Sequence, residues 1–369
     1  MDLETGIVAL IDRFGEAGAH ALIGLALGAA FGVLARLTGF CTRAMVAEWV
    51  TGSGGRQRAV WPIAFAVTIL AVQLMLAFDW IYVAETRFFG TVQSVSGAIA
   101  GGLLFGVGMA LARGCASRLL VLGAGGNLRA LATVAIIGAT AWATITGPLV
   151  PLRDALGGLV LTARIGGNDL LALLSWPQGA GVAVGVGLLA VAAFAARRVG
   201  ISSALATGAA LIGLIVPAGW LALHLLSGQV FDPIQVESLS FVRPLASTAA
   251  LTTEPAAWLS FDGAIVAGTL AGAFAAALLT GRFHLEGFGA KGAAHPLRYV
   301  SGGLLMGFGG VLAVGCTVGA GLTGGSVLAV TGLLGIASML AGAAATIAVI
   351  ERGARRLEPF RAPAIQPAE

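Results

Sequence analysis

Three cysteines carry most of the chemistry that this sequence offers: Cys41, Cys115 and Cys316. Two of them end the same motif, because residues 101–115 (GGLLFGVGMALARGC) and 302–316 (GGLLMGFGGVLAVGC) match at 10 of 15 positions without a gap. A thiol is a weak hydrogen-bond donor with a soft, polarisable sulfur, so it suits a sulfur-rich anion better than a hard oxyanion. Since a thiolate would repel a dianion, we expect neutral S–H groups at these positions.

A buried cysteine is often only a small apolar side chain, and this interpretation is open for each of the three. The shared position in the repeat favours a function for Cys115 and Cys316. Cys41, in the segment LTGFCTRAMVAEW, also follows a helix of small residues, but it has no partner in a repeat. Its spacing alone favours neither interpretation.

Glycine-rich segments with hydroxyl side chains follow the two repeated cysteines, for example GCTVGAGLTGGS at 315–326. Irregular backbone at membrane depth is tolerated only where protein buries it or a wet cavity borders it. We therefore expect re-entrant turns inside the protein, with full crossing by both helices as the alternative. A helix that begins after such a turn directs unpaired N–H groups inward, which favours an anion. The candidate anion contacts are Gly114, Ser117, Gly315, Thr317, Thr323 and Ser326.

Three arginines are further candidates for anion binding, since Arg43 follows Cys41 while Arg113 and Arg118 flank Cys115. Arginine is rare at membrane depth and is usually functional there. At the membrane interface the same side chains would only extend toward water.

Other kinds of chemistry are not indicated. The number of cysteines is odd and none forms a C-x-x-C pair, which is a poor disulfide framework. The four histidines are scattered, no acidic cluster has metal-ligand spacing, and no Walker A segment is present. We predict a protein that is not an enzyme and that holds no metal and no cofactor.

The composition is that of a protein in a lipid bilayer. Only 10% of the residues are charged and 58% are hydrophobic, whereas a soluble domain carries roughly a quarter charged residues. Apolar runs of about 20 residues, long enough to cross a bilayer, recur along the chain. We predict an all-α polytopic membrane protein with about nine membrane-inserted helices plus short helices. The expected long segments are 20–38, 59–82, 94–113, 128–149, 178–196, 203–226, 259–281, 299–314 and 326–349, with a short one at 43–50.

Glycine and charge add detail to this prediction. The 56 glycines recur at four-residue spacing in Gly24/Gly28/Gly32, Gly97/Gly101 and Gly102/Gly106, which indicates close helix packing. The net charge of +4 fits an excess of Lys and Arg in cytoplasmic loops better than nucleic-acid binding. The first 19 residues carry five charged side chains, so we expect no cleavable signal peptide there.

The connector charges predict an orientation in the membrane. Cationic connectors at 51–58, 197–202 and 282–298, and the tail from 351, alternate with neutral or acidic connectors at 83–93, 150–177 and 227–258. Because Lys and Arg concentrate in cytoplasmic loops, the N-terminus is predicted outside and the C-terminus in the cytoplasm.

The two cysteine hairpins, 94–149 and 299–349, then enter from opposite sides and form an inverted repeat, a common plan of transporters. We predict one transmembrane domain over 1–369, with a first pseudo-repeat at 20–150 and a second at 178–349 that has an extra crossing at its start. In this scheme, segment 20–38 corresponds to 203–226, and 59–82 to 259–281.

Residues 302–329 resemble the signature of the YeeE/YedE family of bacterial inner-membrane proteins, as do GFCTRA at 39–44 and ARGCASR at 112–118. This resemblance implies a thiosulfate-uptake protein of hourglass-like shape, in which short re-entrant helices bring three cysteines along a path for the ion. Carried over by position, Cys41, Cys115 and Cys316 would pass thiosulfate, or a related small sulfur anion, by S–H···S contacts without a covalent bond. The family is also linked to cytosolic sulfur-carrier proteins of the TusA type, which would receive the sulfur.

Two other functions are considered. One is a membrane thiol-redox enzyme that passes electrons between cysteines; the missing C-x-x-C and the long gaps between cysteines count against it. The other is a membrane subunit that docks a sulfur carrier without transporting anything itself.

Overall fold

The computed structural model describes residues 3–177, 179–230, 234–250, 260–289 and 295–357, and these are helical with no strand among them. The tail beyond 357, and parts of connectors 227–258 and 282–298 that contribute to the predicted charge pattern, lie outside the described residues. The helices of the first half are α1 (Leu3–Thr38), α2 (Thr42–Thr51), α3 (Gln57–Ala77), α4 (Val95–Leu111), α5 (Ala116–Ala124), α6 (Leu128–Ile145), α7 (Val150–Gly157), α8 (Thr162–Ile165) and α9 (Leu170–Leu173). Those of the second half are α10 (Gly179–Val199), α11 (Ser203–Ser227), α12 (Val242–Ala249), α13 (Phe261–Leu279), α14 (Pro296–Leu312), the π-helix η3 (Thr317–Gly324) and α15 (Val330–Leu357).

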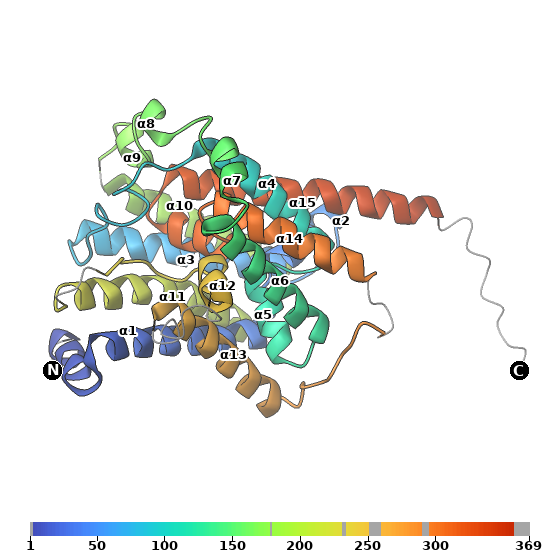
Figure 1. The fold of residues 1–369 in the computed structure, drawn as a ribbon, viewed down its shortest axis with the longest axis horizontal. Coiled ribbons are helices and arrows are strands. Elements are labelled where there is room, and N and C mark those ends of the chain that lie inside the picture. The colour runs from blue at the N-terminus through green and yellow to red at the C-terminus, as the bar shows by residue number, and fades with distance from the viewer. Residues whose placement is uncertain (1–2, 178, 231–233, 251–259, 290–294, 358–369) are drawn as a thin grey trace, which may run out of the picture.

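Nine helical segments of the described chain are long and apolar enough to cross a membrane, which confirms an all-α polytopic membrane protein. The long helices run roughly along the long axis of the molecule (Figure 1). We call the end of the bundle at which α1 begins the N-side and the end at which α15 ends the C-side; they lie to the left and right of Figure 1.

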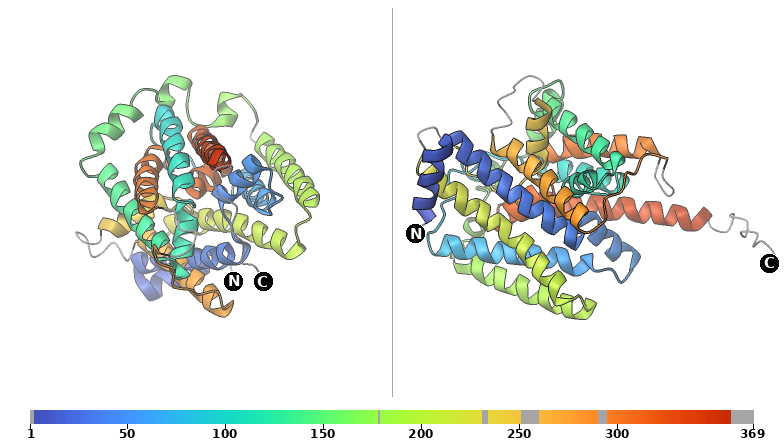
Figure 2. Two further views of the ribbon diagram at one scale, coloured as in Figure 1. Left: turned by 90° about the vertical axis from the view of Figure 1, so that its right-hand side faces the viewer. Right: turned by 90° about the horizontal axis from the view of Figure 1, so that it is seen from below.

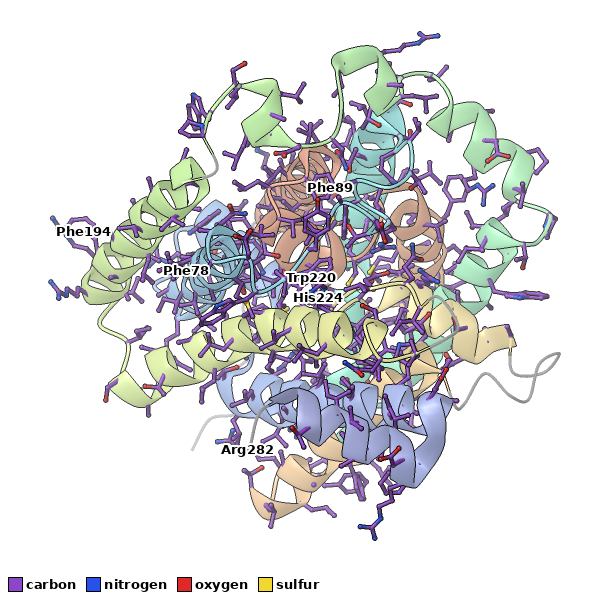
Figure 3. The ribbon with its side chains drawn as sticks, turned by 90° about the vertical axis from the view of Figure 1, so that its left-hand side faces the viewer. Phe78, Phe89, Phe194, Trp220, His224 and Arg282 are labelled. Carbon is purple, nitrogen blue, oxygen red and sulfur yellow. The ribbon has the colours of Figure 1, made fainter. Side chains whose placement is uncertain are left out.

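The outer surface of the bundle exposes large apolar side chains, as expected for a surface that faces lipid. Phe194 on α10 is 60% exposed and Leu279 at the end of α13 is 89% exposed, whereas Trp220 on α11 is fully buried. Figure 3 shows Phe194 pointing away from the bundle and Trp220 in its interior. Helices that are apolar on every face belong in a membrane or in a deep core.

Helices α4 and α14 cross with their backbones in contact. A Cβ atom added to Gly101 would lie 2.5 Å from the carbonyl oxygen of Gly309, and one added to Gly309 would lie 2.5 Å from that of Gly101. Gly108 and Gly302 face each other in the same way, at 2.6 and 2.8 Å. The close packing predicted from glycine spacing is therefore present. The other predicted glycines also meet neighbouring backbones: Gly24, Gly28 and Gly32 meet α13, Gly97 meets Leu312, and Gly102 and Gly106 meet α15.

Two membrane crossings are broken at a cysteine and run in opposite directions. The first, α4–α5, ends in a turn on the C-side, where Leu128 N donates to Glu286 O at 3.0 Å. The second, α14–η3, ends in a turn on the N-side, where Val330 N donates to Asn168 O at 2.8 Å. The hairpins thus differ from the expected re-entrant form: each turn reaches the connectors of the far side, and the break lies part-way along the crossing.

The glycine-rich segment after Cys316 also differs from the expected irregular turn. Residues Thr317–Gly324 form the π-helix η3, and all of 315–329 are buried. The backbone polar groups of this segment are thus paired within a helix and shielded by protein, which a membrane requires. Short π-helical segments occur frequently at functional sites.

The packing of the helices supports the predicted inverted repeat without testing its boundaries. Helix α1 packs on α13 while α3 packs on α11, and α4 packs on α15 while α6 packs on α14. Exchanging the two predicted repeats converts each of these contacts into its counterpart. Helix α10, the extra crossing, packs on α3 and lies at the rim of the bundle (Figure 2). The division into 20–150 and 178–349, like the hourglass-like shape, stays a prediction.

The contact between α4 and α14 can be tested with Gly309→Ala. The new methyl group would meet the Gly101 carbonyl oxygen at 2.5 Å, and overpacking of this kind lowers stability by about 1–3 kcal/mol. We expect a lower melting temperature of the purified protein in detergent. Gly187→Ala on α10 is the control, because a Cβ there has nothing within 4 Å. Equal melting of both variants would contradict the contact.

Candidate functional site

Each cysteine occupies the same point of a repeated backbone motif. Cys41, Cys115 and Cys316 are extended and directly precede the short helices α2, α5 and η3. In all three cases the residue two positions earlier has a positive φ: 69° at Gly39, 63° at Arg113 and 60° at Val314. This conformation is strained for arginine and more so for the β-branched valine, and such strain concentrates at functional sites. Cys41, which has no repeat partner in the sequence, therefore shares the local structure of the other two.

The three breaks bring the cysteine side chains together inside the bundle. The thiols of Cys41 and Cys115 lie close enough to interact through their side chains, and Cys316 is close enough to Cys115 to interact with it electrostatically. All three are free thiols, and the most exposed of them, Cys41, is only 5% exposed. Cys115 thus interacts with both of the others.

Polar groups on the short helices surround the thiols. Cys115 Sγ lies 3.5 Å from Ser117 Oγ, and it also interacts with the Thr317 side chain of the second hairpin. Gly319 N at the start of η3 donates to Cys316 Sγ at 3.5 Å. Two of the predicted anion contacts, Ser117 and Thr317, therefore lie beside a cysteine.

The other predicted contacts on this hairpin hold backbone in place. Thr323 Oγ1 donates to Leu239 O at 2.6 Å and Ser326 Oγ donates to Thr323 O at 2.7 Å, so both hydroxyl protons are used within the protein. Gly315, at φ 151°, has no room for a Cβ, which would lie 2.9 Å from Ala320 N. Gly114 shares this place in the first hairpin, directly before Cys115.

A fourth break, before α12, adds a residue that the sequence did not single out. Ser240 is 3% exposed, and its hydroxyl has no hydrogen-bond partner among the described residues. It lies against η3, because a Cβ added to Gly319 would meet Ser240 Oγ at 2.5 Å. The backbone of the neighbouring Phe241 interacts with the Cys316 thiol. An unpaired buried hydroxyl beside a thiol is consistent with a polar group reserved for a ligand.

A cavity of about 760 Å³ opens on the N-side and leads to this site. Its wall includes Val314 and Gly315, the two residues before Cys316. It is also lined by cationic side chains from three separate elements: Arg87 from the connector between α3 and α4, Arg153 from α7 and Arg243 from α12. An anion in this cavity would therefore be next to the Cys316 break.

The predicted arginines lie on the other side of the cysteines. Arg43 interacts electrostatically with Arg113 and with Arg298 at the C-side start of α14. Arg118 acts on Cys41 and on Arg36, which itself donates to Arg282 O at 2.6 Å. Arg43, Arg113 and Arg118 thus form part of a cationic region on the C-side of the site.

Sequence reasoning missed Ser240, Arg87 and Arg243, together with Glu237, which pairs with both of these arginines. The segment SLSFVRP (238–244) contains an arginine and a proline, and it lies in the stretch 227–258, which was expected to be a connector. The signal that was available is topological: in an inverted repeat the break at Cys41 needs a counterpart, and α12 follows that counterpart. Among the described residues, no group of three or more His, Cys, Asp or Glu side chains is placed to hold a metal ion.

Comparison with known protein families gives one result that covers most of the chain. The model of the family described as sulphur transport matches residues 37–345. The chain belongs to this sulphur transport family. The match confirms the resemblance to YeeE/YedE proteins, and it includes Cys41, Cys115 and Cys316. No individual curated protein sequence matches the chain.

Two buried serines, Ser240 and Ser238, allow an effect on ligand binding to be distinguished from an effect on stability. Ser240→Ala removes a hydroxyl that has no hydrogen-bond partner among the described residues, so we expect unchanged stability but weaker binding of a small sulfur anion. Ser238→Ala is the matched control: Ser238 is also buried but donates to Val216 O at 2.7 Å, and its loss should lower stability by about 0.5–1.5 kcal/mol. Melting curves and calorimetric titration of the purified variants measure both effects. A stability loss in Ser240→Ala equal to that in Ser238→Ala would show that Ser240 is structural.

Proposed function

We propose that this protein carries thiosulfate, or a related small sulfur anion, into the cytoplasm along a path lined by Cys41, Cys115 and Cys316. The observation that carries the proposal is the convergence of the three cysteines. They are far apart in the chain, yet they share one backbone motif and lie together in the interior. Membership of a sulphur transport family supplies the substrate class.

The relay is non-covalent. A thiol donates its proton to the terminal sulfur of thiosulfate, and the soft sulfur atoms match in size and polarisability. The anion moves from Cys316 to Cys115 to Cys41, and the N–H groups at the start of η3 and the side chains of Ser117 and Thr317 bind its oxygens. Each contact is weak and is replaced by a similar one further along, which allows the anion both to enter and to leave. No bond is made or broken, so the protein acts as a transporter or channel and not as an enzyme.

The proposal includes a membrane, an orientation and a partner. The protein resides in the bacterial inner membrane with its N-side outside and its C-side in the cytoplasm. The N-side cavity is then the entrance, and the cationic region around Arg43, Arg113 and Arg118 faces the exit. A cytosolic sulfur carrier of the TusA type receives the sulfur there. Reporter fusions to the C-terminus test the orientation.

A second candidate function gains support from one observation, the proximity of the Cys41 and Cys115 thiols, whose side chains interact. Two adjacent thiols are the minimum that a thiol-redox enzyme needs. The long sequence gap that counted against this function is closed by the fold. The two candidates predict different results for a cysteine-to-serine substitution. A hydroxyl can replace an S–H donor but cannot form a disulfide.

The test is uptake of labelled thiosulfate by proteoliposomes that contain only the purified protein. Cys115→Ala and Cys316→Ala each remove a donor to a charged ligand, a contact worth about 1.5–3 kcal/mol, so uptake should fall by about tenfold or more. Cys115→Ser should retain a larger part of the uptake than Cys115→Ala. Sulfate uptake should be absent throughout.

Each other outcome has a meaning. Wild-type uptake in both alanine variants would make the cysteines packing residues. Equal loss in the serine and alanine variants, together with an oxidised Cys41–Cys115 pair after turnover, would favour the redox enzyme. No uptake by the purified protein, but uptake after a TusA-type carrier is added, would favour a docking subunit. Uptake is compared only among variants whose melting temperature and incorporation into the liposomes equal those of the wild-type protein.

A further inference from the structure

A chain of ion pairs lies beside the N-side cavity, because Arg87 and Arg243, which line this cavity, both pair with Glu237. Arg87 Nη2 lies 2.6 Å from Glu237 Oε1, and Arg243 Nη1 lies 3.4 Å from Glu237 Oε2. Arg243 Nε in turn lies 3.5 Å from Asp262 Oδ2 at the start of α13. The Glu237 side chain is only 10% exposed, so its carboxylate is held between two guanidinium groups away from bulk water.

This cluster already compensates its own charge. It contains two guanidinium groups and two carboxylates, so the charge of Arg87 and Arg243 is already neutralised by Glu237 and Asp262. A dianion bound by these two guanidinium groups would lie near the Glu237 carboxylate, and like charges at short distance disfavour one another. Arg87 and Arg243 therefore bind a dianion better after Glu237 loses its charge.

We propose that Arg87 and Arg243 form the anion-capture site of the cavity, and that Glu237 takes up one proton from the cavity water when the anion binds. This inference rests on the proposed transport of a sulfur anion and adds its coupling ion. The neutral Glu237 leaves the cluster with one net positive charge and frees the guanidinium groups of Arg87 and Arg243, which line the cavity, for the anion. Anion and proton thus enter the site together.

The position of Arg87 joins this site to the cysteine path. Arg87 Nη2 also donates to Val314 O at 2.9 Å, and Val314 is the strained residue, at φ 60°, two positions before Cys316. Its Nε is buried and has no hydrogen-bond partner among the described residues. One guanidinium group therefore contacts the carboxylate and the break, and it retains a free donor for a ligand.

The surroundings of Glu237 agree with protonation. Burial raises the pKa of its carboxyl group and the nearby Asp262 carboxylate acts in the same direction, while Arg87 and Arg243 lower the pKa; burial dominates and the pKa is raised. The groups that face it are Arg87 from the connector before α4, Arg243 from α12 and Asp262 from α13. Arg153 and Asp154 of α7 line the same cavity and pair with each other at 2.8 Å.

The first experiment uses the wild-type protein in detergent, titrated with thiosulfate from about pH 5 to about pH 8. Thiosulfate remains a dianion throughout this range, so any pH dependence belongs to the protein. With one linked proton, affinity should rise as the pH falls, by at most about tenfold per pH unit. In weakly buffered solution, binding should withdraw up to about one proton per anion. Binding that withdraws no proton and does not vary with pH overturns the inference.

Variants assign the proton to Glu237. Glu237→Gln mimics the neutral acid, so its affinity at about pH 8 should equal that of the wild type at about pH 5 and should not change with pH. Asp154→Asn is the matched control, a carboxylate of the same cavity that is 61% exposed and paired with Arg153; it should keep the wild-type pH profile. Arg243→Gln should weaken binding at every pH.

The outcomes separate this inference from the proposed function. A wild-type pH profile in Glu237→Gln overturns the role of Glu237 while transport stands. Loss of the pH profile in Asp154→Asn assigns the proton to Asp154 and also overturns it. No thiosulfate binding by the wild type at any pH overturns the proposed function and this inference together.

Discussion

Helices α4 and α14 contact each other directly through the backbones of their glycines, and this contact determines where the cysteines meet. Gly108 and Gly309 both lie in this contact, and each precedes a cysteine by seven residues, about two helical turns. The two helices run in opposite directions, with Gly108 against Gly302 and Gly309 against Gly101, so the breaks that follow lie on either side of the same contact. A larger side chain at the contact would separate the helices and, with them, Cys115 from Cys316. Small residues are what allow such an approach between membrane helices.

The breaks make the two ends of the molecule different. A broken helix leaves backbone N–H groups unpaired, and within a membrane such groups need protein or a wet cavity around them. On the N-side they adjoin a cavity in which the guanidinium groups are compensated by carboxylates. On the C-side, Arg43 and Arg118 lie among further arginines. This difference in charge fits the proposed direction of uptake, from the N-side to the C-side.

Much of this organisation can be predicted from the sequence, because membrane crossings, glycine packing and the repeat around Cys115 and Cys316 are local patterns. The sequence could not show which residues that are far apart in the chain come into contact. Glu237 and Arg87 are 150 residues apart, and only the fold makes them an ion pair. Ser240 and Cys41 stand at breaks that no sequence repeat marks, and Cys41 shares only its backbone conformation with Cys115 and Cys316. The π-helix η3 was missed because eight glycine-rich residues have no hydrophobic period to indicate a helix.

The central claim is that a sulfur anion contacts the three thiols inside the bundle. The most direct measurement is a crystal structure with selenosulfate, a thiosulfate analogue whose terminal selenium is located by anomalous scattering. We expect selenium peaks in van der Waals contact, at about 4 Å or less, with the sulfur atoms of Cys316, Cys115 or Cys41. Selenium bound only at the protein surface, with the space between the cysteines filled by side chains, would contradict it.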